Sequence, residues 1–148
     1  MVSTQENKLM GRCQCGKVAY CISSQPHSLN VCYCLECQRQ SGSAFALTLV
    51  VPSSGVHLLP SSQKYIGHFE RKTESGGIRG GIFCTDCGVR IYHSNPDAPQ
   101  WISIKAGTLD QKVDFSKATH IWTKRKLQGM VIPEGVEAWE EEPEDGVV

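Results

Sequence analysis

The chain has 148 residues, a mass of 16.3 kDa and 40% hydrophobic residues, which is enough for one domain with one hydrophobic core. Lys and Arg together number 15, as do Asp and Glu, so the balanced charge predicts neither a nucleic-acid nor a membrane partner. Residues 1–10 contain no apolar segment of the secretory kind, and no apolar run is long enough to span a membrane. We therefore expect a cytoplasmic, reducing setting, in which close cysteines act as metal ligands rather than disulfides.

Short alternating or β-branched apolar segments predict strands along most of the chain. In chain order they lie at 18–22, 45–51, 56–59, 65–70, 89–93, 101–106 and 120–123. Residues 26–30 are expected to break the chain, and a glycine-rich stretch at 76–81 is expected to lead through Ile82 and Phe83 into Cys84. Helical periodicity is weak and is best at residues 37–41.

These elements predict one all-β domain over residues 11–136, with at most one or two short helical turns. Residues 1–10 are polar and are expected to form a flexible N-terminus. Residues 137–148 are expected to form an acidic C-terminal tail in solvent, because six acidic residues lie between Glu137 and Asp145.

Seven of the eight cysteines form three close clusters, namely Cys13 with Cys15, Cys32 with Cys34 and Cys37, and Cys84 with Cys87. A structural zinc site takes four protein ligands, whereas a catalytic site takes three and keeps one position open. The three thiolates of the middle cluster can bind one ion without help from elsewhere, and the two outer pairs together make a closed site. The sequence thus predicts two zinc ions per chain. One is structural, at Cys13, Cys15, Cys84 and Cys87, and one is catalytic, at Cys32, Cys34 and Cys37.

Other arrangements stay open at this stage. The clusters could pair differently, a histidine such as His93 could be a fourth ligand, or the triplet could form a redox loop beside a single zinc. All seven cysteines could also be reduced core residues, although clustering serves no packing purpose. Cys21 lies on a predicted strand in an apolar context and is expected to be such a core residue.

Three motifs, in this order, resemble those of the glutathione-dependent formaldehyde-activating enzyme family, which includes centromere protein V. They are Gly11-Arg-Cys-Gln-Cys-Gly16, Cys32-Tyr-Cys-Leu-Glu-Cys-Gln-Arg-Gln-Ser-Gly-Ser43 and Phe83-Cys-Thr-Asp-Cys-Gly88. The resemblance implies a zinc-bound fold of small twisted antiparallel sheets and the same division of the cysteines. There are departures: Tyr33 stands where members commonly carry histidine, and Gln38-Arg39 leaves one positive charge where a basic pair is common.

By this resemblance we expect a zinc-dependent carbon–sulfur lyase or synthase that acts on an adduct of the S-hydroxymethylglutathione type. Its small-molecule partner would be a thiol such as glutathione, deprotonated at the catalytic metal so that it can attack formaldehyde. Arg39 is predicted to bind a carboxylate of this thiol, and Ser41, Gly42 and Ser43 to offer hydroxyl or N–H groups. A solvated role for Arg39 and a helix cap at 41–43 are the alternatives.

Two other functions fit the same motifs. The chain could be a non-enzymatic, zinc-stabilised binding or scaffold module, or the same fold could act on a different thiol or carbonyl compound. The sequence predicts no particular oligomeric state.

Overall fold

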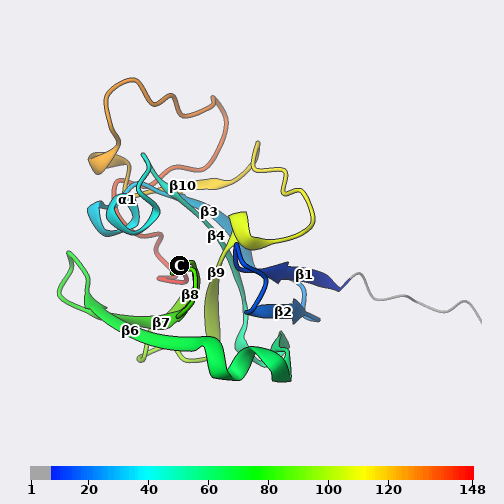
Figure 1. Cartoon of the computed structure of the whole chain (residues 1–148). Helices are drawn as coiled ribbons and strands as arrows, with labels where there is room; N and C mark the ends of the chain where they lie inside the picture. Colours follow the sequence, from blue (N-terminus) through cyan, green and yellow to red (C-terminus); the bar gives the residue numbers. More distant parts are fainter. Residues whose placement is uncertain (1–7) are drawn as a thin grey trace, which may run out of the picture.

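The computed structural model describes residues 8–148 and consists of two β-sheets and one short α-helix (Figure 1). The small sheet has three strands in the order β1-β2-β5, and the large sheet has seven in the order β10-β3-β4-β9-β8-β7-β6. The strands are β1 (Leu9–Arg12), β2 (Ala19–Ile22), β3 (Ser28–Cys32), β4 (Ala46–Pro52), β5 (Val56–Leu58), β6 (Ile66–Lys72), β7 (Ile78–Cys84), β8 (Arg90–Ser94), β9 (Trp101–Lys105) and β10 (Thr119–Ile121).

The helical content is small, and the predicted all-β class is confirmed. Helix α1 (Leu35–Ser41) follows β3 directly and ends at Gly42, whose left-handed φ of 60° is typical of a helix C-cap. Four 3₁₀ segments make the remaining turns, at η1 (Ser53–Gly55), η2 (Pro60–Tyr65), η3 (Ala106–Thr108) and η4 (Thr123–Arg125). In the described part of the chain, no helix is both long and apolar enough to cross a membrane.

The strand pairs are antiparallel with one exception. At one edge of the large sheet, β10 pairs in parallel with β3, and Thr119 lies opposite Asn30. A parallel pair needs a long crossover between its strands. Here the crossover contains the rest of the large sheet, so two distant parts of the sequence meet beside the end of β3.

The two faces of the large sheet differ in chemistry because side chains alternate along each strand. One face is apolar and packs against the small sheet, where Leu49, Val51 and Ile104 join Tyr20 and Ile22 in the main core. The cross-strand register places on the other face a set of polar residues, all nearly or fully buried: Asn30, Thr48, Ser103, His93 and Arg79. Buried polar groups need partners, so this second face is the place to look for a site.

Besides β1, two strands lie where the sequence did not predict them. Strand β3 covers residues 28–32, although Pro26 to Asn30 were expected to break the chain, and β7 covers the glycine-rich stretch before Cys84. Glycine has a low strand propensity, which hid β7. In the fold, however, Gly81 is needed for close packing, since an added Cβ would lie 2.1 Å from the Tyr92 carbonyl oxygen.

We expect alanine at Gly81 to destabilise the protein by about 1–3 kcal/mol, because the backbone of β8 cannot move away without breaking the sheet. Urea unfolding followed by circular dichroism measures the change. Gly107→Ala is the matched control, since nothing lies within 4 Å of a Cβ at that position. Equal unfolding midpoints for the two variants would contradict this account of β7.

The ends of the chain differ from the domain limits expected from the sequence. Residues 1–7 of the expected flexible N-terminus lie outside the described residues, and β1 already begins at Leu9. The acidic segment 137–148 runs beside β10 instead of standing free: Glu137 accepts a hydrogen bond from His120 N, and Trp139 N donates one to the His120 carbonyl, both at 2.8 Å. Figure 1 shows the end of this segment turning into the hollow of the curved large sheet.

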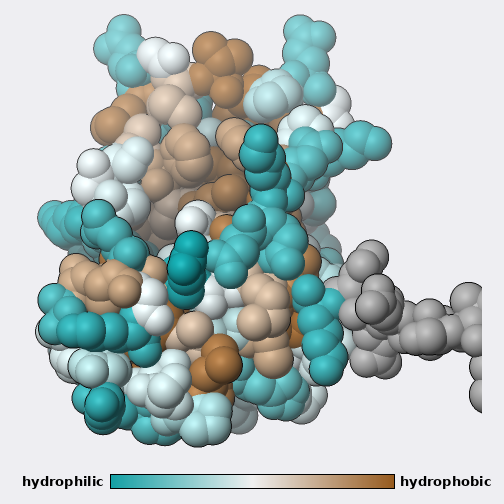
Figure 2. Space-filling view, turned by 45° about the vertical axis from the view of Figure 1, so that its right-hand side comes forward, coloured by the Kyte–Doolittle hydropathy of each residue, from teal (hydrophilic) through white to brown (hydrophobic). Residues whose placement is uncertain are grey.

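Charged and apolar residues are mixed on one face of the molecule. On the face shown in Figure 2, hydrophilic side chains surround small groups of apolar ones.

Candidate metal centres

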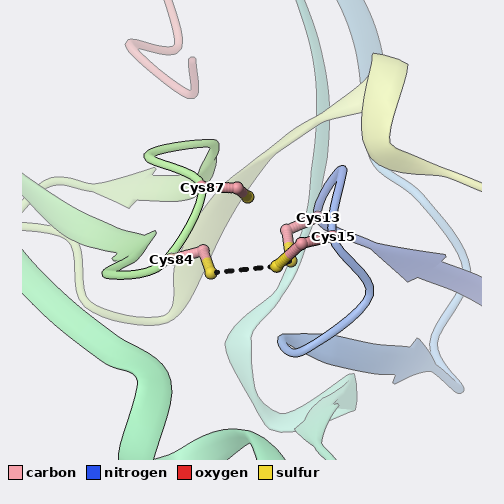
Figure 3. A group of neighbouring side chains, drawn as sticks. All are labelled: Cys13, Cys15, Cys84 and Cys87. Atoms are coloured by element: carbon pink, nitrogen blue, oxygen red, sulfur yellow. Dashed lines mark hydrogen bonds between the residues drawn. The ribbon is translucent and has the colours of Figure 1, made fainter.

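The first candidate centre lies between the two sheets. Cys13 and Cys15 come from the turn after β1, whereas Cys84 ends β7 and Cys87 lies in the turn that follows it (Figure 3). All four sulfurs lie within 4.8 Å of one another. The Cys13 and Cys15 sulfurs are 3.5 Å apart, and the Cys15 and Cys84 sulfurs are 3.7 Å apart.

These distances fit a zinc ion. A tetrahedral site with Zn–S bonds of about 2.3 Å separates its sulfurs by roughly 3.8 Å. Each cysteine pair also lies on a tight turn that closes on a glycine with positive φ, at 79° for Gly16 and 78° for Gly88. Gly16 N donates to the Cys13 carbonyl and Gly88 N to the Cys84 carbonyl, so a backbone hydrogen bond closes each turn, back to the third residue before Gly16 and to the fourth residue before Gly88.

The groups around this centre act differently on its thiols. The backbone N–H of Lys17 lowers the pKa of Cys15, but burial and hydrogen bonds with the other three thiols raise it to about 12, whereas a thiolate is favoured at Cys87. Val18 N donates to the Cys13 sulfur at 3.3 Å. Although desolvation raises the pKa of Cys87, backbone N–H groups of Val89 and Cys15 and hydrogen bonds from neighbouring thiols lower it to about 6. Lys17 pairs with Asp86 at 2.8 Å and joins the two turns outside the cluster. Four sulfurs are the complete donor set of a structural zinc site, in which no position stays open.

The second candidate centre lies at the other end of the large sheet. Cys32 ends β3, Cys34 is the N-cap of α1 and Cys37 lies one turn into that helix, with all three sulfurs within 4.8 Å of one another. Cys32 and Cys37 are buried and Cys34 is half-buried. Because the helix starts inside the cluster, six consecutive residues are enough to bring the three sulfurs together.

Hydrogen bonds and charges also favour a thiolate here. Cys37 N donates to the Cys34 sulfur at 3.3 Å, and Gln40 Nε2 lies 3.5 Å from the Cys37 sulfur. Hydrogen bonds from the Cys32 and Cys34 thiols lower the pKa of Cys37, and the positive charges of Lys105 and Arg71 add to this against the effect of burial. Three sulfurs are the donor set of a zinc site with an open position.

A cavity of about 240 Å³ opens onto this second centre. The three cysteines, Ile121 and Trp122 line one side of it, and residues from the polar face of the sheet line the other, with Arg71, Arg79 and His93 among them. Trp122 has a φ of 57°, the one positive value at a non-glycine residue in the described chain. Such strained residues gather at functional sites.

His93 had been considered as a metal ligand, and the structure gives it another partner. Its Nδ1 lies 2.9 Å from Lys105 Nζ, and neither cysteine group in the described chain includes a histidine. Burial and the charges of Lys105, Arg71, Arg79 and Arg90 lower its pKa well below the usual value. His93 is therefore neutral, and burial lowers the pKa of Lys105 to about 8.

The residues predicted to bind substrate lie in two places. Arg39 lines the cavity, but its side chain is 70% exposed and pairs with Glu36. Ser41, Gly42 and Ser43 end helix α1, and the Ser41 hydroxyl donates to the Cys37 carbonyl at 2.7 Å. None of these three lines the cavity. Their contact with a substrate stays a prediction, whereas their capping role is visible.

Two cavity residues were missed from the sequence, Arg71 and Arg79. Arg71 lies just beyond the predicted strand 65–70, and Arg79 lies in the glycine-rich stretch whose strand was not foreseen. Tyr33, which replaces the histidine common in the family, points away from the cavity instead. It is fully buried, and its hydroxyl lies 2.8 Å from His120 Nδ1.

Fold and site define a mostly-β protein with two cysteine clusters able to hold metal, one closed and one open to a cavity. The sequence model of the glutathione-dependent formaldehyde-activating enzyme family matches residues 8–125. The chain belongs to this family, which confirms the resemblance of its three motifs.

The fold is also known from a solved structure. A crystal structure of a Rhodobacter sphaeroides protein aligns with 70% of this chain and 90% of its own, at 18% sequence identity and a TM-score of 0.56. No curated protein matches the sequence.

Proposed function

We propose that this protein is a zinc-dependent carbon–sulfur lyase or synthase, acting on the adduct of formaldehyde with glutathione or a similar thiol. The observation that carries the proposal is the second cluster, Cys32, Cys34 and Cys37, in which three converging sulfurs face a cavity. Family membership supports the substrate class. The closed cluster supports a structural role for the other metal, and so two zinc ions per chain.

In the synthetic direction, the thiol sulfur forms a bond to the formaldehyde carbon, and the carbonyl oxygen takes up the proton. The product is the S-hydroxymethyl adduct, a hemithioacetal, and the lyase direction reverses both changes. A zinc ion held by Cys32, Cys34 and Cys37 would supply a position at which the incoming thiol is present as a thiolate.

The surrounding residues prepare this reaction in two ways. Lys105 and Arg71 place positive charge near the sulfurs, which offsets the negative charge of three thiolates. Ile121 and Trp122 give the cavity an apolar side, which limits the access of water to the reacting thiol. The need for reduced cysteines and a free thiol fits a cytoplasmic location.

The test uses the zinc-loaded full chain with glutathione and formaldehyde, and NMR exchange spectroscopy measures the rate of adduct formation. We expect the chain to accelerate formation and breakdown equally above the spontaneous rates, since a catalyst does not change the equilibrium. Cys34→Ser is the control, because it is expected to stay folded and to lose only the zinc ion of the second cluster. Unchanged rates, together with no binding of glutathione at millimolar concentration, would instead favour a scaffold function.

A further inference from the structure

Arg71 and Arg79 form an unusual pair on the cavity side of the large sheet. They lie directly opposite each other on β6 and β7, and both line the cavity that holds the three cysteines. Like charges at directly opposed positions destabilise a sheet. A pair that breaks this local rule beside a cavity points to a functional role.

Among the residues that the structure describes, only one of these two arginines has a carboxylate partner. Arg79 is 9% exposed in its side chain, and its Nη2 lies 3.5 Å from the Glu142 carboxylate. The Nε atom of Arg71 is buried, and it has no hydrogen-bond partner among residues 8–148. A buried guanidinium donor is normally satisfied, so this unpaired donor indicates a partner that comes from outside the chain.

We propose that Arg71 and Arg79 together bind a carboxylate of the thiol substrate. This inference rests on the proposed function, because it places the sulfur of the same molecule at Cys32, Cys34 and Cys37. Guanidinium groups match carboxylates with two parallel hydrogen bonds, which makes them selective for that group. The protein then selects thiols that carry a carboxylate over neutral thiols.

Glu142 shows that a carboxylate can reach this wall of the cavity. It belongs to the acidic segment beside β10 and forms an ion pair with Arg79. A substrate carboxylate has to share Arg79 with Glu142 or displace it. Replacement of Glu142 by glutamine is therefore expected to strengthen the binding of an anionic thiol several-fold.

The experiment is calorimetric titration of the zinc-loaded full chain with four probes: glutathione, its diethyl ester, S-methylglutathione and 2-mercaptoethanol. Glutathione should bind about 10- to 100-fold more tightly than the ester, as expected for hydrogen bonds between charged groups. Arg71→Gln should weaken the binding of glutathione and of S-methylglutathione by a similar factor and leave the binding of the ester unchanged. Arg12→Gln is the control, because Arg12 is 66% exposed and pairs with Asp110 outside the cavity.

The outcomes separate this inference from the proposed function. Equal binding of glutathione and its ester to the unmodified chain would overturn the carboxylate site and leave the proposed function intact. If 2-mercaptoethanol and the ester both fail to bind, no thiol binds at the cysteines and the proposed function fails. S-methylglutathione has no free thiol, so its binding measures the contribution of the two arginines independently of the metal site. Should Arg71→Gln not fold, Arg71→Lys keeps the charge without the two-pronged geometry, and it should still weaken glutathione. Unaltered binding by that variant would count against the site.

Discussion

Serine in place of Cys84 is expected to unfold the domain. Cys84 is fully buried, and its cluster joins turns that belong to different sheets, with Cys15 and Cys84 separated by 69 residues in the sequence. Closing a chain segment of that length costs on the order of 4 kcal/mol plus a constant. Structural zinc offsets this with about 10–16 kcal/mol, which is comparable with the whole stability of a typical domain, about 5–15 kcal/mol. Without the fourth sulfur, little net stability remains.

Zinc content and thermal unfolding by circular dichroism measure this effect. The unmodified chain should contain two zinc ions, one for each cysteine group. Cys21→Ser is the matched control, since Cys21 is half-buried and belongs to neither group. It should cost about 1 kcal/mol and leave the metal content unchanged. A Cys84→Ser protein with a normal unfolding transition would show that the closed cluster does not hold the fold.

Serine in place of Cys34 should have the opposite pattern: a folded protein that has lost one zinc ion and its activity. Cys34 is the N-cap of α1, and its sulfur accepts the hydrogen bond of Cys37 N. Serine is among the best N-cap residues, so its hydroxyl can replace the sulfur in this bond. A neutral hydroxyl does not replace a thiolate as a zinc ligand. The three sulfurs are also neighbours in the sequence, so their metal closes no long loop.

We expect the activity of Cys34→Ser to fall by about 100-fold or more, because even residues that only orient zinc ligands change activity by 10–100-fold. Cys34→Ala separates the two roles of the residue. It should lose the same metal and, in addition, about 1 kcal/mol of stability through the missing cap. If Cys34→Ser unfolds as completely as Cys84→Ser, the second cluster is a structural site and provides no open metal position for the proposed reaction.

The cysteine clusters could be predicted because their chemistry is local. Two pairs and a triplet can each be recognised from spacing alone, and zinc coordination number then divides them. The strands β4 and β9 could be predicted for a similar reason, since residues 46–52 and 101–105 alternate or are β-branched. These features depend on nearest neighbours in the chain.

The cavity could not be predicted, because it depends on strand register. Arg71 lies opposite Arg79 only when β6 and β7 pair. The sequence did not predict β7, because it contains glycines, of which Gly81 allows close packing against β8. Sequence reasoning instead placed substrate contacts at Arg39 and at residues 41–43, which are close to the triplet in the chain. Arg39 does line the cavity, whereas residues 41–43 at the end of α1 do not, and the contact of all four with a substrate stays a prediction.

The parallel pairing of β3 with β10 has a consequence for the time course of folding. Proteins whose contacts join distant parts of the chain fold slowly, on a scale of milliseconds to seconds. The large sheet is complete only when residues 28–32 have paired with residues 119–121. The closed cluster is complete only when Cys13 has met Cys84. During that interval the thiols are open to oxidation and to exchange with other thiols. With zinc at both clusters, as proposed above, newly made chains would depend on a supply of zinc at the time of synthesis, and metal shortage would reduce the yield of folded protein before it affects molecules that are already folded.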